Sequence, residues 1–248
     1  MSKPSALDRD AVLVVGASGA IGAAVARQLL ADGRPVGLHY RSNAAAVTPM
    51  ASAAGARASL LQAALDDEPA CNALADRFIA AFPQATGLAV CSGEVGWRDW
   101  RALEAADWNK IFFQHCIAPF LLARRLLPHF EKRGGGSIVY LSSISPKYGG
   151  SEKSLHYAAA KAALETSMLG LAKAVAASAI RINGVRAGFV DTPQQQAGRT
   201  PAELAARIEK IPLRRAGTPD EIAGAFSYLL SDSAAFVTAQ HLTVAGGD

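Results

Sequence analysis

The sequence has few of the residues that build metal sites and disulfides. Its 248 residues include three cysteines, Cys71, Cys91 and Cys116, which lie far apart and form no Cys-x-x-Cys pair. Neither these cysteines nor the five histidines show the spacing of metal ligands. We therefore expect no metal site, and reduced thiols of the kind typical of the cytoplasm.

Long apolar runs and runs of one charge are also missing. Charged residues, Gln or Gly interrupt the apolar stretches well before the roughly 18 residues that a transmembrane helix needs. The first ten residues, MSKPSALDRD, lack the apolar core of a signal peptide. The net charge is +4, without the lysine and arginine runs that follow nucleic acid. We expect a cytoplasmic protein that binds neither membrane nor nucleic acid and tolerates anionic ligands.

What the sequence does contain is enough apolar surface for one large core. Half of the residues are hydrophobic and 19% are charged, so we expect residues 1–248 to fold as a single domain. Short strand-like runs alternate with longer helical segments, which predicts an α/β fold: a Rossmann-type, doubly wound parallel sheet of about seven strands with helices on both faces. The expected strands are 11–15, 35–40, 58–62, 87–91, 137–142, 180–185 and 241–244. The expected helices are 19–31, 69–82, 107–130, 155–177, 201–210 and 219–230.

A glycine-rich loop follows the first expected strand and opens the first expected helix. Gly16, Gly19 and Gly22 are spaced three residues apart in the segment GASGAIG. Glycines allow a tight turn and close approach of the backbone to a pyrophosphate, and a helix N-terminus offers free N–H groups. The loop therefore predicts a dinucleotide-binding site, although a tight strand-to-helix turn without a ligand would need similar residues.

The end of the second expected strand bears on which dinucleotide is bound. A carboxylate at this point would hold the ribose 2′-hydroxyl of NAD, whereas this chain has Tyr40, Arg41 and Ser42. A cation and a hydroxyl suit a 2′-phosphate. We therefore predict NADP(H); the alternative is that Arg41 is an ordinary solvated surface residue.

Tyr157 and Lys161 form the main catalytic candidate. They stand four residues apart in an expected helix and so share one face. A phenol is a good proton donor near neutral pH, and a neighbouring ammonium lowers its pKa. Ser143, at the end of the fifth expected strand, could donate a hydrogen bond to a carbonyl oxygen as charge develops there.

Over nearly its whole length the chain resembles the short-chain dehydrogenase/reductase family. The segments that carry the resemblance are GASGAIG, ADWNKIF, SIVYLSS, YAAAK, IRINGV and TPDEIAGAFSYLLSD. The resemblance implies that Ser143 orients the substrate, Tyr157 is the acid/base, and Lys161 binds the nicotinamide ribose. It places these residues around the cofactor: Gly16, Ser18, Gly19, Ile21, Gly22, Tyr40, Arg41, Ser42, Ser92, Gly93, Tyr157, Lys161, Gly188, Val190 and Thr192.

Four segments depart from the family pattern. The family's NNAG reads Val90-Cys91-Ser92-Gly93, its acidic residue near the adenine falls on Ala64, and its Pro-Gly is Ala187-Gly188. His115 replaces the Asn that anchors a water-linked proton relay. As a candidate catalytic residue, this histidine could supply a donor and an acceptor or titrate near neutral pH, or it could be a packed core histidine.

The resemblance is strongest to reductases of the 3-oxoacyl-acyl-carrier-protein type, in the branch associated with polyenes and polyketides. It implies NADPH-dependent reduction of a keto group, with an acidic acyl carrier protein as a possible partner. A set of basic residues could steer such a carrier, or could simply lie on solvated helix faces: Arg124, Arg125, Lys132, Arg133, Arg207, Lys210, Arg214 and Arg215. A non-catalytic subunit paired with an active homologue and an alcohol dehydrogenase with another small substrate are the alternatives.

Two further expectations concern assembly and substrate access. In this family the helices at 107–130 and 155–177 form a four-helix dimer contact, so we expect a homo-oligomer, either a dimer or a tetramer. The polar stretch 193–201 matches the position of the family's substrate-covering loop, and we expect it to be flexible before the next helix.

Overall fold

A computed structural model describes residues 10–197 and 199–248. Its centre is a parallel sheet of seven strands in the order β3-β2-β1-β4-β5-β6-β7. The strands are β1 (Val12–Val15), β2 (Val36–Tyr40), β3 (Ala58–Gln62), β4 (Gly87–Val90), β5 (Gly136–Ser143), β6 (Ile180–Ala187) and β7 (His241–Val244). The predicted Rossmann-type α/β fold is confirmed, and all seven predicted strands are present.

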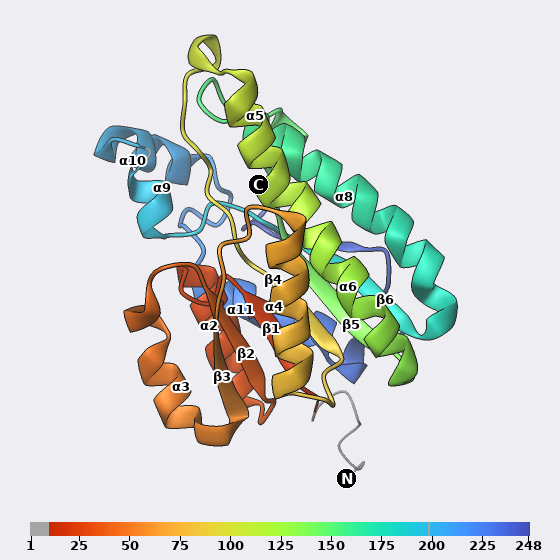
Figure 1. The fold of residues 1–248 in the computed structure, drawn as a ribbon. Coiled ribbons are helices and arrows are strands. Elements are labelled where there is room, and N and C mark those ends of the chain that lie inside the picture. Colours follow the sequence, from red (N-terminus) through yellow and green to blue (C-terminus); the bar gives the residue numbers. More distant parts are fainter. Residues whose placement is uncertain (1–9, 198) are drawn as a thin grey trace.

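Helices cover both faces of this sheet (Figure 1). They are α2 (Ala20–Ala31), α3 (Thr48–Ala54), α4 (Glu68–Ala81), α5 (Ala105–Phe112), α6 (Ala118–Lys132), α7 (Ser145–Tyr148), α8 (Leu155–Val175), α9 (Pro193–Ala197), α10 (Pro201–Glu209) and α11 (Pro219–Leu230). One core cluster lies between the sheet and α4, α6 and α8. A second lies between the opposite face and α2 and α11.

Local hydrogen bonds set several of these boundaries. At the start of α11, Thr218 accepts a hydrogen bond from the Glu221 N–H, and the Glu221 side chain accepts one from the Thr218 N–H. This capping box satisfies N–H groups that the first helical turn leaves unpaired. Strand β1 is buried along its whole length, as expected for a strand covered on both faces.

The expected continuous helix over 107–130 is wrong in one respect. A π-helical turn, Phe113–Ile117, separates α5 from α6. Pro119 has no N–H to donate to the carbonyl of His115 four residues earlier, so the regular α-helical ladder cannot run through this point. The wider turn places His115 on the buried side, where only 2% of its surface is exposed.

The stretch 193–201, predicted to be polar and flexible before the next helix, contains the short helix α9 and the start of α10. Both helices project beyond the carboxyl ends of the strands, near the segment that precedes α5 (Figure 1). Within the described part of the chain, no helix is long and apolar enough to cross a membrane. The same residues contain no cluster of His, Cys, Asp and Glu suited to a metal ion.

Candidate active site

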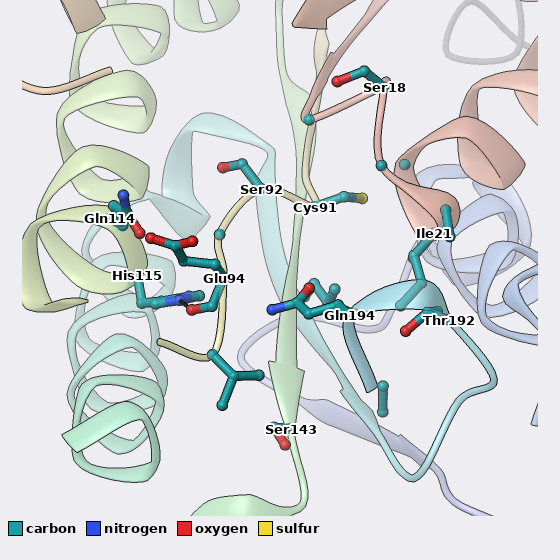
Figure 2. A pocket seen from close by; sticks show the side chains of 18 of the residues that line it. Ser18, Ile21, Cys91, Ser92, Glu94, Gln114, His115, Ser143, Thr192 and Gln194 are labelled. Carbon is teal, nitrogen blue, oxygen red and sulfur yellow. Dashed lines mark hydrogen bonds between the residues drawn. The ribbon is translucent and has the colours of Figure 1, made fainter. Parts of the chain in front are cut away.

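The candidate site lies at the carboxyl edge of the sheet, where parallel strands bring their following loops together. A cavity of about 700 Å³ opens there. Figure 2 shows Ser18 and Ile21 on one side, Gln114 and His115 on the other, and Ser143 at the end of a strand between them. Segments from β1, β4, β5 and β6 therefore contribute to one site, although they are distant in the sequence.

Most of the predicted site residues line this cavity. They are Gly16, Ser18, Gly19, Ile21, Gly22, Arg41, Ser92, Gly93, His115, Ser143, Tyr157, Lys161, Gly188, Val190 and Thr192. Tyr40 and Ser42 do not line it. Side chains alternate along a strand, so Tyr40 points away from the direction of His39 and Arg41 and packs on the second core cluster. Ser42 is exposed beyond the end of β2.

The glycine loop has the shape needed to hold a pyrophosphate. Gly16 has a φ of +84°, and a Cβ there would lie 2.8 Å from the backbone of Ser92. A Cβ on Gly22 would lie 2.1 Å from the carbonyl oxygen of Gly16. Helix α2 has no side-chain cap at Gly19, which leaves its first N–H groups available for an anion. These residues therefore fit the phosphates of a dinucleotide.

His39 is a site residue that we did not predict from the sequence. Its Nδ1 accepts a hydrogen bond of 3.0 Å from the Gly16 N–H, and its Nε2 donates one of 3.1 Å to the Ala63 carbonyl. Burial lowers the pKa of His39 to about 4, so the ring is neutral. A neutral ring with this tautomer ties the glycine loop to the end of β3. The period of β2 offered a signal, because it places His39 and Arg41 on one face.

A carboxylate also lies beside the predicted 2′-phosphate site. Arg41 forms an ion pair of 3.1 Å with Asp66, and both side chains are more than half exposed. The family's acidic position was expected at Ala64, which does not line the cavity, whereas Asp66 does. Arg41 is therefore neither a free phosphate ligand nor an unpartnered surface residue.

Tyr157 and Lys161 lie together on α8 and face the cavity. The Lys161 ammonium donates a hydrogen bond of 2.5 Å to the Leu141 carbonyl and lies 5.7 Å from the centre of the Tyr157 ring. Burial raises the pKa of Tyr157 to about 12, with the Ser143 hydroxyl acting in the opposite direction. Burial lowers the pKa of Lys161 to about 8. At neutral pH the phenol is therefore protonated and the lysine is still mostly charged.

The Ser143 hydroxyl is held in place at the carboxyl end of β5. Its Oγ accepts a hydrogen bond of 3.0 Å from the Ser145 N–H, and it donates one of 3.0 Å to the Ser145 hydroxyl. The first residue of α7 thus fixes the direction of Ser143. A substrate oxygen in the cavity could compete for the proton that Ser143 now gives to another hydroxyl.

His115 lies next to the catalytic candidates. Its ring is 5.0 Å from that of Tyr157 and edge-on to it. Its Nε2 donates a hydrogen bond of 2.7 Å to the Glu94 carbonyl, while its buried Nδ1 has no hydrogen-bond partner in the described residues. Burial lowers the pKa of His115 well below its usual value, which favours the role of a neutral donor and acceptor over that of a group that titrates near neutral pH. The ring offers one unused acceptor next to the site.

The comparisons with known proteins agree with this geometry. A family model described as enoyl-(acyl carrier protein) reductase matches residues 16–248. The chain belongs to the short-chain dehydrogenase/reductase family. Members of this family are oxidoreductases that use a nicotinamide cofactor, and this chain is one of these enzymes by descent.

Two relatives and one solved structure illustrate the family's range. The chain is 34% identical to the uncharacterized oxidoreductase YmfI of Bacillus subtilis, over 95% of this chain and 97% of the relative. It is 34% identical to cis-4-hydroxycyclohexanecarboxylate dehydrogenase of Sinomonas cyclohexanicum, over 95% and 94%. The structure of 7α-hydroxysteroid dehydrogenase in complex with NADH and 7-oxo glycochenodeoxycholic acid superposes with a TM-score of 0.90 and 26% identity, covering 99% of this chain and 98% of that one.

The arrangement suits the interconversion of an alcohol and a ketone by hydride and proton transfer. When bound, a reduced nicotinamide would supply hydride to a carbonyl carbon. Tyr157 can give its proton to the carbonyl oxygen, Ser143 can donate a hydrogen bond to it, and the Lys161 charge favours the resulting phenolate. The glycine loop would hold the phosphates, and His39 would keep that loop in place.

Proposed function

We propose that this enzyme uses NADPH to reduce the keto group of a 3-oxoacyl thioester carried by an acyl carrier protein, giving a secondary alcohol. The observation that carries the proposal is the protonated Tyr157 phenol beside the charged Lys161, on the wall of one cavity with Ser143. A phenol that is protonated at neutral pH can donate its proton in the reductive direction, in which an alkoxide must be protonated.

Support for NADPH comes from Arg41, which lines the cavity at the end of β2. An arginine can form two hydrogen bonds with a phosphate. Asp66 works against this preference, because its carboxylate neutralises Arg41 and would repel the 2′-phosphate. The related hydroxysteroid dehydrogenase structure contains NADH, so the choice depends on the balance between these two side chains.

The basic residues that could steer an acidic carrier protein give little support to a carrier-bound thioester. Arg124, Arg125, Arg207 and Arg215 form ion pairs with neighbouring carboxylates, which reduces the field that could steer an acidic carrier. Lys210 lines a second cavity of about 810 Å³, which also includes Ser143 and Tyr157. A long acyl chain could enter along this second cavity.

A second candidate is an alcohol dehydrogenase for a small substrate that carries a carboxylate. The relative from Sinomonas is named for a cyclic hydroxy carboxylate, and this candidate needs the same Ser143, Tyr157 and Lys161. We favour both enzyme proposals over a non-catalytic subunit, because a purely structural chain has no physical need to bury Lys161 beside Tyr157.

The test is NADPH consumption with an acetoacetyl thioester, with Tyr157→Phe as the variant. We expect turnover by the natural chain and a loss of at least about 100-fold in kcat in the variant, because the proton donor is removed. A Tyr228→Phe variant is a matched control, since Tyr228 is 43% exposed on α11 and lines neither cavity. NADPH binding without turnover of the thioester would contradict the proposed substrate, and equal activity of Tyr157→Phe would contradict the mechanism.

A further inference from the structure

The second cavity joins the catalytic residues to a half-buried arginine. Ser143 and Tyr157 lie on its wall together with Trp97, Phe189 and Arg199. The two aromatic residues come from the loop after β4 and the segment after β6, and Arg199 lies between α9 and α10. A molecule that reached Tyr157 through this cavity would therefore pass the guanidinium group of Arg199.

Arg199 is held between two aromatic rings. Its guanidinium carbon lies 4.6 Å from the centre of the Trp97 ring and 5.4 Å from that of Phe189. The indole N–H of Trp97 donates a hydrogen bond of 3.3 Å to the Gln194 carbonyl, which links the two loops. A guanidinium fixed by its faces keeps the N–H groups at its edge free to form directional hydrogen bonds.

These edge groups are largely unused. Only Nη1 of Arg199 has partners, and both belong to Gln195: the carbonyl oxygen at 3.4 Å and the amide oxygen Oε1. Nε and Nη2 have no hydrogen-bond partner among the residues that the structure describes. Gln195 is neutral, so neither bond compensates the positive charge of Arg199.

Three acidic side chains line this cavity, Glu152, Glu203 and Asp248, and the last two are engaged in other hydrogen bonds. The Glu203 carboxylate accepts hydrogen bonds of 2.6 Å from the Thr200 N–H and 3.0 Å from its hydroxyl, at the start of α10. Asp248 pairs with Arg207 and accepts a hydrogen bond from Tyr148. Arg199 forms no ion pair within residues 10–197 and 199–248.

The electrostatic setting of Arg199 favours an anion. Burial, and then the neighbouring positive charge of Arg207, lower the pKa of Arg199 below its usual value, while the Glu203 carboxylate acts in the opposite direction without forming an ion pair. A cation that has lost part of its hydration without gaining an ion pair is costly. An oxyanion in the cavity would replace the lost hydration with charge-assisted hydrogen bonds.

We propose that Arg199 determines substrate specificity by binding an oxyanion of the carbonyl substrate, either its own carboxylate or the phosphate of a pantetheine arm. The inference rests on the proposed ketoreductase function and names the class of its substrate: a ketone joined through an apolar spacer to an anionic group. The apolar spacer would lie along Trp97 and Phe189.

The kinetic test compares charged substrates with neutral partners that carry the same ketone but lack the anionic group. The pairs are 5-oxohexanoate with its methyl ester, and acetoacetyl-coenzyme A with the acetoacetyl thioester of N-acetylcysteamine. In Arg199→Gln we expect KM for an anionic member to rise about 10- to 100-fold, the range for hydrogen bonds to charged groups, with kcat little changed. The neutral members should change less than about twofold, and Arg199→Lys should recover part of the loss.

The pair that responds identifies the source of the anion. An effect on 5-oxohexanoate alone assigns a substrate carboxylate, and an effect on the coenzyme A thioester alone assigns a phosphate. Arg101→Gln is the matched control, because Arg101 also stacks on an indole, 4.5 Å from the centre of the Trp100 ring, but lines neither cavity. Equal changes for charged and neutral substrates, or no change for either, would overturn the proposal.

A binding measurement separates this inference from the proposed function. Hexanoate and free coenzyme A carry the anion but no reducible ketone, and their binding can be followed by tryptophan fluorescence through Trp97. We expect one of them to bind the natural chain and to bind Arg199→Gln at least 10-fold more weakly. This result would support the anion site even if no ketone were reduced, and equal binding to both proteins, or none to either, would refute it.

Discussion

Lys161 is the residue on which the protonation state of the site depends. The residue is 3% exposed, and its ammonium donates a hydrogen bond to the Leu141 carbonyl, with the Tyr157 ring nearby. Burial lowers its pKa from 10.5 to about 8, so between these values the unfolded chain binds more protons than the folded one. The contribution of Lys161 to the free energy of unfolding must then increase as the pH rises through this window.

This predicts a pH-dependent difference between the natural chain and Lys161→Met. Relative to the variant, the natural chain should gain about 2 kcal/mol in free energy of unfolding between pH 7 and pH 9.5, because its folded lysine loses a costly charge. Urea unfolding at several pH values measures this difference, and subtracting the variant removes contributions from Cys91 and other groups. A difference that stays flat across the window would show that Lys161 keeps an ordinary pKa.

Arg41 and Asp66 give a second prediction at the residue scale. Arg41→Ala should lower the NADPH-to-NADH ratio of kcat/KM by about 10- to 100-fold, because it removes a cation from the 2′-phosphate. Asp66→Asn should raise the same ratio, since it frees Arg41 from its 3.1 Å ion pair and removes a repelling charge. Initial rates with both cofactors provide the measurement, and a ratio unchanged in both variants would contradict the assignment of NADPH.

The connection between β1 and α2 leaves no room for a Cβ atom at Gly22. Gly22 lies in the first turn of α2, where a Cβ would meet the Gly16 carbonyl oxygen at 2.1 Å. A methyl group there must push the glycine loop away from the helix. The loop would then lose its close approach to a dinucleotide. The fold of the sheet does not depend on that approach.

Gly22→Ala should therefore weaken cofactor binding at least 10-fold and lower the melting temperature. Gly224→Ala is the matched control, because Gly224 lies in α11 and a methyl group added there would meet nothing within 4 Å. There the helix propensity of alanine should stabilise the protein by about 0.5–1 kcal/mol. Titration with NADPH and thermal unfolding give the two readouts, and the same sign for both variants would refute the steric argument.

At the scale of the whole molecule, the outer face of α8 is the feature that suggests self-association. Ala162, Thr166 and Gly170 are exposed one turn apart along it, and Ile117 nearby is 43% exposed. Small residues let a second helix approach closely, so this face suits the helix contact that the family resemblance implies. We propose a homo-oligomer on this basis.

We expect light scattering to give a mass of two or four times 25.8 kDa for the natural chain. Gly170→Arg should lower that mass, because it places a long charged side chain in the centre of the contact. Ala31→Arg, at an exposed position of α2 on the other side of the sheet, should leave the mass unchanged. A natural chain that is monomeric at micromolar concentration would contradict the expected oligomer.

Local patterns in the sequence were sufficient for the order of strands and helices and for most of the site. Buried strands read as continuous apolar runs, and the four-residue step from Tyr157 to Lys161 places both on one helix face whatever surrounds them. The π-helical break at Phe113–Ile117 was missed because, in the sequence, the segment before Pro119 cannot be told apart from an ordinary α-helix. The alternation along β2 was overlooked, so Tyr40 was predicted in place of His39.

The sequence by itself determined the α/β class, the glycine loop and the choice of Ser143, Tyr157 and Lys161 as catalytic candidates, because these follow from the order of the elements and from local spacing. Only the tertiary structure decided the neutral state of His39 and His115, the pairing of Arg41 with Asp66, and the aromatic clamp around Arg199. These properties depend on how far a side chain is removed from water and which distant side chains it meets. Burial and pairing are set by packing between elements, which no local pattern encodes.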